Sequence, residues 1–154
     1  MNRVGITFNF LVFFLPLIMI SCSPKPEPIN YGQDICELCK MNITDNKFAA
    51  EIVTKKGKVH KFDSIECLFI FKNVEIEVAE IHSEWVNDFA NPGELINLKN
   101  AFFLHSDVFR SPMGLNVLSF SSKEKRDEIK NQHGGKELTY DEVFKLALND
   151  EMHH

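Results

Sequence analysis

Residues 48–71 read Phe48-Ala-Ala-Glu-Ile-Val53-Thr-Lys-Lys-Gly57-Lys-Val-His-Lys-Phe62-Asp-Ser-Ile-Glu-Cys-Leu-Phe-Ile-Phe71, and the local structure of the chain is clearest here. Two short segments, 48–53 and 58–62, alternate apolar and polar residues. The turn between them contains Gly57, so the pattern predicts a β-hairpin. Asp63-Ser64 can cap a helix, and the apolar residues that follow predict a short helix with one buried face. The stretch is therefore predicted as strand, strand, helix.

A second block further along the chain has the same order. Ala101-Phe-Phe-Leu-His105 and Leu115-Asn-Val-Leu-Ser-Phe120 predict two strands, and a helix from Lys123 to Gln132 follows and stops at Gly134-Gly135. In each block a phenylalanine ends the second strand and a small polar residue opens the helix, which indicates a weak internal repeat. Antiparallel strands with helices on one face predict an α+β fold of two small related halves, about 31–90 and 91–150.

Two further elements complete the predicted secondary structure. Glu84-Trp-Val-Asn-Asp-Phe89 predicts a strand, and Asn91-Pro92-Gly93 predicts the turn that ends it. A final helix is predicted from Tyr140 to about Leu148. Thr139 with Glu142 three residues later matches the capping box that commonly opens a helix.

The N-terminus predicts export and lipid attachment. A short positive start at Arg3 precedes an apolar stretch over residues 6–20, and Ser21-Cys22 ends it, as in a secretory signal. The context of Cys22 resembles the lipobox of bacterial lipoproteins, although Met19 stands where leucine is more usual. The resemblance implies a signal peptide over residues 1–21 and a lipidated Cys22 that anchors the chain to a membrane; an ordinary cleaved signal is the alternative. Residues 22–30 contain three prolines and predict a flexible tether.

Charge and compartment restrict the function. The chain has a net charge of −5, and removal of the signal takes away the basic Arg3. A basic footprint for nucleic acid is therefore absent, and no nucleic-acid partner is expected. An exported chain also meets an oxidising compartment, where paired cysteines often form disulfides, so metal binding by thiols has to compete with oxidation.

The residues with the clearest chemistry carry sulfur. Cys36-Glu-Leu-Cys39-Lys-Met41 places two thiols and a thioether within six residues, and Met113 lies inside Ser111-Pro112-Met113-Gly114. Soft sulfur ligands select soft ions, which makes Cu(I) the first candidate. Thioethers resist protonation and disulfide formation, an advantage for a carrier outside the cytoplasm. Methionine usually fills cores, but these two lie beside cysteine or within a tight turn, so we expect them to be ligands.

Several motifs together resemble the NosL family, whose members are lipoprotein accessory proteins of nitrous oxide reductase. The resemblance covers nearly all of the chain beyond the signal. It implies Cu(I) binding in the cell envelope, facing the periplasm, and delivery towards the apo-reductase with help from a membrane ABC-type complex. It also implies two small related α+β halves, in agreement with the repeat. The motifs, in the order and spacing of the family, are CxxCxM at 36–41, Phe62-Asp-Ser-Ile-Glu-Cys67, Trp85-Val-Asn-Asp-Phe89, Ser111-Pro-Met-Gly114, Gly134-Gly135 and Thr139-Tyr-Asp-Glu142.

The resemblance also implies a ligand set. The family's ligand motif falls on Cys39-Lys40-Met41 and its second methionine on Met113, with Lys40 in place of the usual glycine. That departure bears on the local backbone, because glycine permits conformations that lysine resists. Cys36 is predicted as an auxiliary ligand; a disulfide with Cys39, or no role in copper transfer, are the alternatives. Cys67, on the apolar side of a short helix, is predicted to be a buried free thiol.

Two other functions are compatible with a CxxC motif. The first is a structural zinc site, for which CxxC supplies half of the ligands. The other half would need Cys67 and a histidine at no familiar spacing. The second is a thiol-disulfide oxidoreductase, whose CxxC should open a helix within an α/β pattern. Here the motif leads to a hairpin instead, and no nucleophile has a matching base and orienting group, so an enzyme is not expected.

Overall fold

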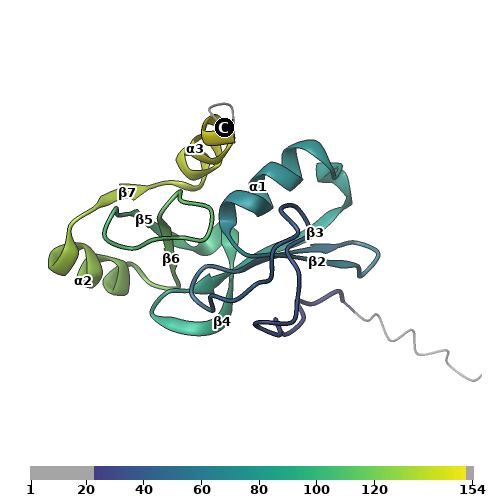
Figure 1. The fold of residues 1–154 in the computed structure, drawn as a ribbon, viewed down its shortest axis with the longest axis horizontal. Helices are drawn as coiled ribbons and strands as arrows, with labels where there is room; N and C mark the ends of the chain where they lie inside the picture. The colour runs from purple at the N-terminus through teal and green to yellow at the C-terminus, as the bar shows by residue number, and fades with distance from the viewer. Residues whose placement is uncertain (1–22, 152–154) are drawn as a thin grey trace, which may run out of the picture.

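The computed structural model describes residues 23–151, and the predicted signal peptide and Cys22 lie outside that range. Two antiparallel sheets lie side by side, with three helices around them (Figure 1). The first sheet has the order β2-β1-β3-β4 and the second the order β6-β5-β7. The strands are β1 (Ala50–Thr54), β2 (Val59–Phe62), β3 (Ile81–Asp88), β4 (Asn91–Asn97), β5 (Phe102–His105), β6 (Val117–Phe120) and β7 (Lys136–Leu138); the helices are α1 (Ile65–Val74), α2 (Lys123–His133) and α3 (Tyr140–Glu151), with short 3-10 turns at Val78–Glu80 and Leu98–Asn100.

The internal repeat is visible in the strand order. In each half a hairpin is followed by a helix, and a third strand then pairs with the first strand of that hairpin. The order second, first, third therefore recurs as β2-β1-β3 and β6-β5-β7. Ser64 caps α1 and Ser122 caps α2, and the phenylalanines before them, Phe62 and Phe120, are both fully buried. The predicted α+β class and related halves are confirmed.

Strand alternation gives the first sheet two different faces. Ala50 pairs with Phe62, and both lie on the face covered by α1, where Phe62 contacts Phe71 with ring centroids 5.2 Å apart. Glu51 pairs with Lys61 and points to the opposite face, because neighbouring residues of a strand alternate. One residue of difference in register would exchange the two faces.

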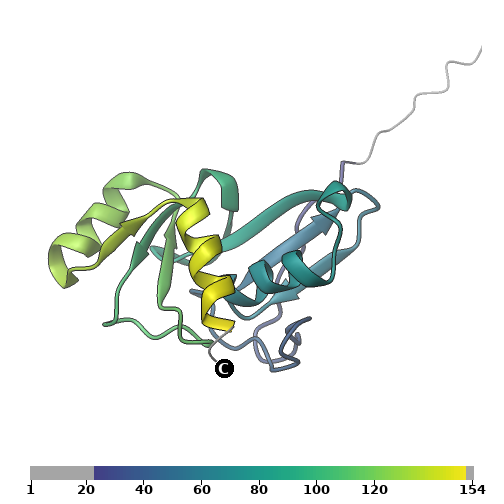
Figure 2. The same ribbon diagram turned by 90° about the horizontal axis from the view of Figure 1, so that it is seen from above.

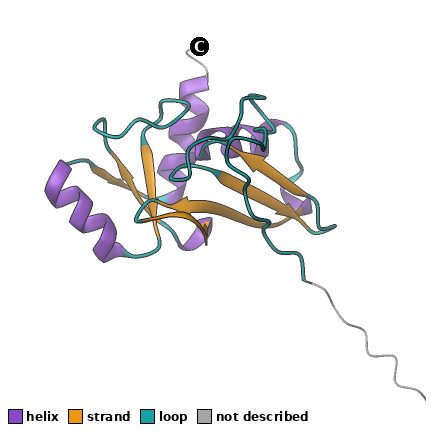
Figure 3. Ribbon diagram, turned by 60° about the horizontal axis from the view of Figure 1, so that its bottom comes forward, coloured by secondary structure: helices purple, strands orange, loops and turns teal. Residues whose placement is uncertain are grey.

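The segment predicted as a flexible tether covers that opposite face from residue 27 onward. The backbone N–H of Glu27 donates to Glu51 Oε2 at 3.2 Å, Lys61 Nζ donates to the carbonyl of Pro28 at 2.8 Å, and Ile29 is buried. Figure 3 shows this segment crossing the sheet as a loop. Tyr31 continues the layer by donating to Asn87 Oδ1 at 3.0 Å. Residues 27–30 thus pack on the sheet, so the prediction of a flexible tether is wrong for these residues.

Two strands, β4 and β7, were not predicted from the sequence. The turn after β3 falls on Phe89-Ala90, and Asn91-Pro92-Gly93 begins β4 instead of forming the turn. Since β4 pairs with β3, the sheets divide between Asn97 and Phe102, and the expected boundary near residue 90 differs from the structure. The second missed strand, β7, has only three residues.

Gly135 is what allows β7 to reach β5. Its φ is +123°, and a Cβ atom there would lie 2.6 Å from the carbonyl oxygen of His105. Gly134, with φ +74°, caps α2 just before it. The two glycines thus end α2 as predicted and also bring the following strand against the sheet.

The two halves share one main core. Phe69 of α1 makes edge-to-face contacts with Tyr140 and Phe144 of α3, both with centroids 5.2 Å apart. Seen from above, α1 and α3 lie side by side across the junction between the sheets (Figure 2). A smaller core under α2 contains Phe48, Leu104, Leu118 and Phe120. Within residues 23–151, none of the helices has the length and hydropathy needed to cross a membrane.

Candidate metal site

The CxxCxM motif forms a closed loop before β1. The N–H of Cys36 donates to the carbonyl of Met41 at 2.8 Å, and the N–H of Lys40 donates to the carbonyl of Cys36 at 3.1 Å. Lys40 takes a left-handed conformation with φ 63°, at the position where the family usually has glycine. The lysine thus keeps the backbone turn that glycine would make. The N–H of Glu37 bonds to the carbonyl of Lys61 at 2.8 Å and fixes the loop to β2.

Four potential ligands converge at the base of this loop. Cys36, Cys39, Cys67 and Asp63 each offer one ligand atom, and these atoms all lie within 4.8 Å of one another. We call these four residues the thiol cluster. Asp63 precedes the cap of α1, and Cys67 lies in the first turn of that helix. The loop and the helix start therefore provide two ligands each.

The thiol cluster is reduced and mostly buried. All three cysteines within residues 23–151 are free, so the structure does not contain the Cys36–Cys39 disulfide that was one alternative. Cys36 and Cys67 have no exposed surface, while Cys39 is partly exposed. The Cys39 thiol donates to Asp63 Oδ2 at 3.6 Å, and the buried Asp63 Oδ1 has no hydrogen-bond partner in the structure. Cys39 is the member of the cluster that solvent reaches.

Hydrogen bonding distributes the protons unequally among the thiols. The Cys67 thiol and the backbone N–H groups of Asp63 and Cys39 donate to the sulfur of Cys36, which lowers the pKa of Cys36 to about 6. The pKa of Cys39 is raised to about 11, first by burial and then by the neighbouring Cys36. The pKa of Cys67 is also raised, first by its hydrogen bond to Cys36. The hydrogen bonding thus favours the thiolate at Cys36 over thiolates at Cys39 and Cys67, and metal binding would release the protons that the ligands still hold.

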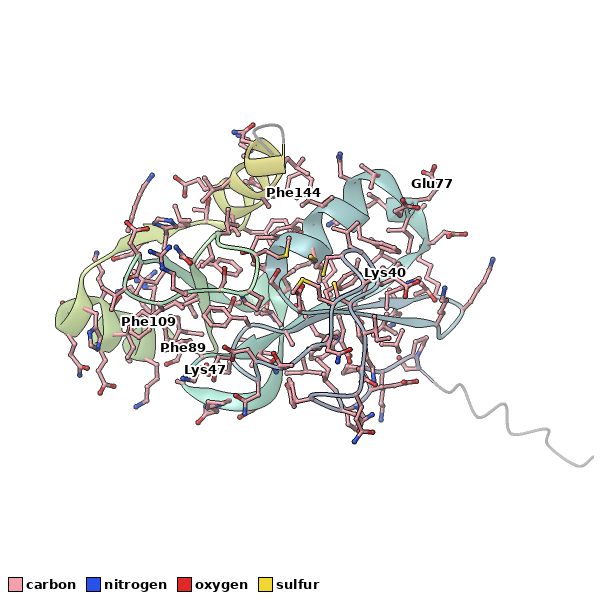
Figure 4. All side chains as sticks on the ribbon, in the orientation of Figure 1. Lys40, Lys47, Glu77, Phe89, Phe109 and Phe144 are labelled. Carbon is pink, nitrogen blue, oxygen red and sulfur yellow. The ribbon has the colours of Figure 1, made fainter. Side chains whose placement is uncertain are left out.

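The two methionines predicted as ligands lie at the surface. Met41 is 58% exposed and Met113 is 39% exposed, so neither fills the core. In the view of Figure 4 the sulfur atoms of the described side chains, in yellow, are drawn below the start of α1, near the label of Lys40. Hydrogen bonds from Ser111 and Leu115 to Glu66 fix the turn that carries Met113 to the start of α1, next to Cys67.

Part of this cluster was predicted from the sequence. Cys36, Cys39, Met41 and Met113 were predicted as ligands, and the structure brings Cys36 and Cys39 together. Cys67 was predicted as a buried free thiol; it is buried, and it lies beside the other two thiols. Asp63 was predicted only to cap the helix. The available signal was their position, since both residues flank the start of the helix that follows the hairpin.

The cluster is suited to binding a soft metal ion. Thiolates favour Cu(I), Zn(II) and related ions, and a carboxylate can complete a four-ligand set. A buried cluster with one partly exposed sulfur gives a metal ion a single side of approach. The exposed thioethers of Met41 and Met113 offer further soft ligands at the surface. Taken together, the fold and the site define a small α+β protein with a sulfur-rich metal site at the junction of two related halves.

The comparison with known families gives this class a name. The NosL family matches residues 29–148, which is most of the chain. The protein therefore belongs to the NosL family.

Two relatives support the assignment. The chain is 24% identical over 164 residues to the copper-binding lipoprotein NosL of Stutzerimonas stutzeri, a match that covers 97% of this chain and 86% of that protein. The crystal structure of the copper chaperone NosL from Shewanella denitrificans matches with a TM-score of 0.66 and 29% identity, covering 77% of this chain and 95% of that one. The second match confirms the α+β architecture independently of the sequence motifs.

Proposed function

We propose that this protein is a lipid-anchored copper carrier of the cell envelope that binds Cu(I) and passes it on without catalysing a reaction. The observation that carries the proposal is the thiol cluster, with its three free thiols and one carboxylate within 4.8 Å. Copper binding and a chaperone role in the two named relatives support it.

The proposed Cu(I) ligands are Cys39, Met41 and Met113, with Cys36 as an auxiliary ligand. Cys39 is partly exposed, and both methionines reach the surface, so these sulfurs can meet an incoming ion first. Low-coordinate sulfur sites favour Cu(I) over harder ions. The buried sulfurs of Cys36 and Cys67 then offer stronger ligands than the thioethers, deeper in the protein. Transfer to a partner proceeds in reverse order, by exchange of the exposed sulfurs.

The proposed setting follows the family resemblance. Residues 1–21 act as a lipoprotein signal, Cys22 carries the lipid, and the copper-binding domain occupies the rest of the chain. The relative from Stutzerimonas stutzeri is named a lipoprotein, which supports the anchor. We propose that the recipients are the maturation machinery of nitrous oxide reductase, including a membrane ABC-type complex, and the apo-reductase itself.

A structural zinc site is the second candidate, because one observation favours it. Three cysteines and one aspartate at close range form a four-ligand set of the kind that Zn(II) binds in closed sites. The fourth ligand is a carboxylate and not the histidine considered from the sequence. Binding through Met41 and Met113 would distinguish Cu(I) from Zn(II), because a thioether is a good ligand for Cu(I) and a poor one for Zn(II).

Metal competition tests the proposal. The reduced apo-protein is titrated under anaerobic conditions with Cu(I) against a chromogenic chelator, and in parallel with Zn(II). We expect Cys39→Ser, Met41→Leu and Met113→Leu each to weaken Cu(I) binding by about tenfold or more, or roughly 1.4 kcal/mol each. The leucine variants keep the side-chain bulk, so unfolding of their apo-forms serves as the control.

Each alternative has its own result in that experiment. A zinc site predicts tight Zn(II) binding and Cu(I) binding that both leucine variants leave unchanged. A thiol oxidoreductase predicts disulfide reduction in an insulin assay. The CxxC loop precedes β1 and does not open a helix, which is unlike the usual arrangement of such enzymes.

A further inference from the structure

The turn that carries Met113 is attached to a carboxylate from the other half of the molecule. Glu66 lies in the first turn of α1 and is only 3% exposed. Its Oε1 accepts two hydrogen bonds, from Ser111 Oγ at 2.7 Å and from the N–H of Leu115 at 2.9 Å. These two residues stand on either side of Pro112-Met113-Gly114. One carboxylate oxygen therefore fixes both ends of the turn.

The turn is also closed on itself. Ser111 Oγ accepts from the N–H groups of Gly114 at 3.2 Å and Asn116 at 2.9 Å, while Asn116 Oδ1 accepts from the N–H of Ser111 at 3.1 Å. Ser111 and Asn116 are 7% and 4% exposed, and only the tip of the turn, with Met113, faces solvent. The turn is thus a closed, hydrogen-bonded unit, and its attachment to Glu66 sets where that unit lies.

The attachment is close to the thiol cluster. Glu66 is followed directly by Cys67, and Asp63 precedes the same helix. Leu115 packs in the core that also contains Cys36 and Cys67. A hydrogen bond to Glu66 consequently fixes the Met113 turn against the element that provides two of the four cluster ligands.

We infer that Glu66 is a positioning residue of the copper site. It binds no metal; it holds the Met113 turn of the second half against the thiols of the first half, so that the thioether completes the Cu(I) site. Partners that orient ligands commonly affect metal affinity by 10- to 100-fold. This inference rests on the proposed function, and a buried carboxylate with two hydrogen bonds to the methionine turn is the observation behind it.

A double-mutant cycle tests the inference through copper binding. Glu66→Ala should weaken Cu(I) binding about tenfold, as Met113→Leu does, and the variant with both changes should be no weaker than either single variant. X-ray absorption should show one fewer sulfur neighbour of copper in Glu66→Ala. Glu66→Gln keeps an oxygen that accepts both bonds, so it should retain parental affinity. Glu51→Gln removes another buried carboxylate, on the far face of the first sheet, and serves as the matched control.

A second readout does not require copper. In the apo-protein, the methyl signal of Met113 in a nuclear magnetic resonance spectrum should shift in Glu66→Ala and in Ser111→Ala, while that of Met41 stays in place. Independent, additive effects of Glu66→Ala and Met113→Leu on affinity, or an unmoved Met113 signal, would overturn the inference. If the parent protein binds no Cu(I) yet the Met113 signal responds, the proposed function fails and the hydrogen-bonded positioning of the turn stands.

Discussion

Lys40 holds a backbone conformation that non-glycine residues rarely adopt. Its φ of 63° allows the CxxCxM loop to close, and its Nζ donates to the carbonyl of Glu37 within the same loop. A left-handed conformation costs about 1–2 kcal/mol for a residue with a Cβ atom. Lys40 stands where the family usually has glycine, and it takes a left-handed conformation that glycine adopts readily.

We expect Lys40→Gly to raise the stability of the apo-protein by up to about 1 kcal/mol, because the relief of strain exceeds the entropy that glycine gains on unfolding. Thermal unfolding measures the change, and Cu(I) affinity should stay the same. Asn116 is also left-handed, with φ 57°, but its side chain accepts from Ser111. Asn116→Gly should therefore lower stability. A less stable Lys40→Gly would mean that the Lys40–Glu37 contact outweighs the strain.

The thiolate of Cys36 depends on its neighbour Cys67. The hydrogen bond from Cys67 is the largest cause of the lowered pKa of Cys36. We expect Cys67→Ala to raise the pKa of Cys36 above about 6, and to weaken Cu(I) binding at neutral pH about tenfold, which corresponds to roughly 1.4 kcal/mol. Ultraviolet absorbance of the thiolate follows the titration. An unchanged titration curve would show that the two thiols are not coupled.

Among the secondary-structure elements, α1 has at its start more residues of the proposed site than any other element. Ser64 caps it, Asp63 and Cys67 belong to the thiol cluster, and Glu66 holds the Met113 turn. The corresponding helix in the second half, α2, begins with Ser122-Lys123-Glu124-Lys125 and has no sulfur ligand. The repeat thus provides the same scaffold twice, and the thiol cluster lies in the first copy, while the second copy contributes the turn with Met113.

Gly135 lies directly before β7, where an added side chain would meet the backbone of β5. We expect Gly135→Ala to destabilise the protein by about 1–3 kcal/mol, because the new Cβ atom would strain the backbone and lie 2.6 Å from the His105 carbonyl oxygen. Gly134→Ala is the control. Its φ is also positive, but no atom lies within 4 Å of the added Cβ, so the cost should be smaller. Equal unfolding free energies for both variants would refute a role for the close approach to β5.

For the whole molecule, the N-terminal segment joins the predicted lipid anchor to the sheet. It covers Glu51, which has no exposed surface and whose Oε1 lacks a hydrogen-bond partner in the structure. Burial raises the pKa of Glu51 to about 7, above its ordinary value of 4.5. Because the segment is docked from Glu27 onward, few residues separate the folded domain from Cys22. A lipidated chain would therefore hold the domain close to the membrane.

The raised pKa of Glu51 predicts that stability falls as pH rises. The folded state binds the proton more tightly than the unfolded state between about pH 4.5 and 7, so the contribution is complete below that window and lost above it. The loss amounts to up to about 3 kcal/mol. We expect Glu51→Gln to reduce this slope, as measured by denaturant unfolding from pH 5 to 8. Parallel curves for parent and variant would contradict the buried, protonated carboxyl.

By itself, the sequence determined the elements whose signals are local. The hairpin with Gly57, the caps Ser64 and Ser122, and the capping box of Thr139 and Glu142 all depend on residues a few positions apart, and all appear in the structure. The CxxCxM motif and the Met113 turn could also be recognised from the sequence, because cysteine and methionine are rare in this chain and here lie in unusual settings. β4 and β7 could not be predicted in this way, because β4 begins with turn residues and β7 has only three residues. Their pairing with β3 and β5 in the folded protein makes them strands.

Only the tertiary structure decided which of these residues meet. Asp63 and Cys67 join the CxxC loop because the hairpin folds the start of α1 back against it, and Glu66 reaches the Met113 turn because the two halves share a core. The docking of residues 27–30 depends in the same way on a sheet face formed by strands far away in sequence. Such contacts arise from burial and hydrogen bonding between distant segments, and local sequence patterns contain no information about which distant partner satisfies them.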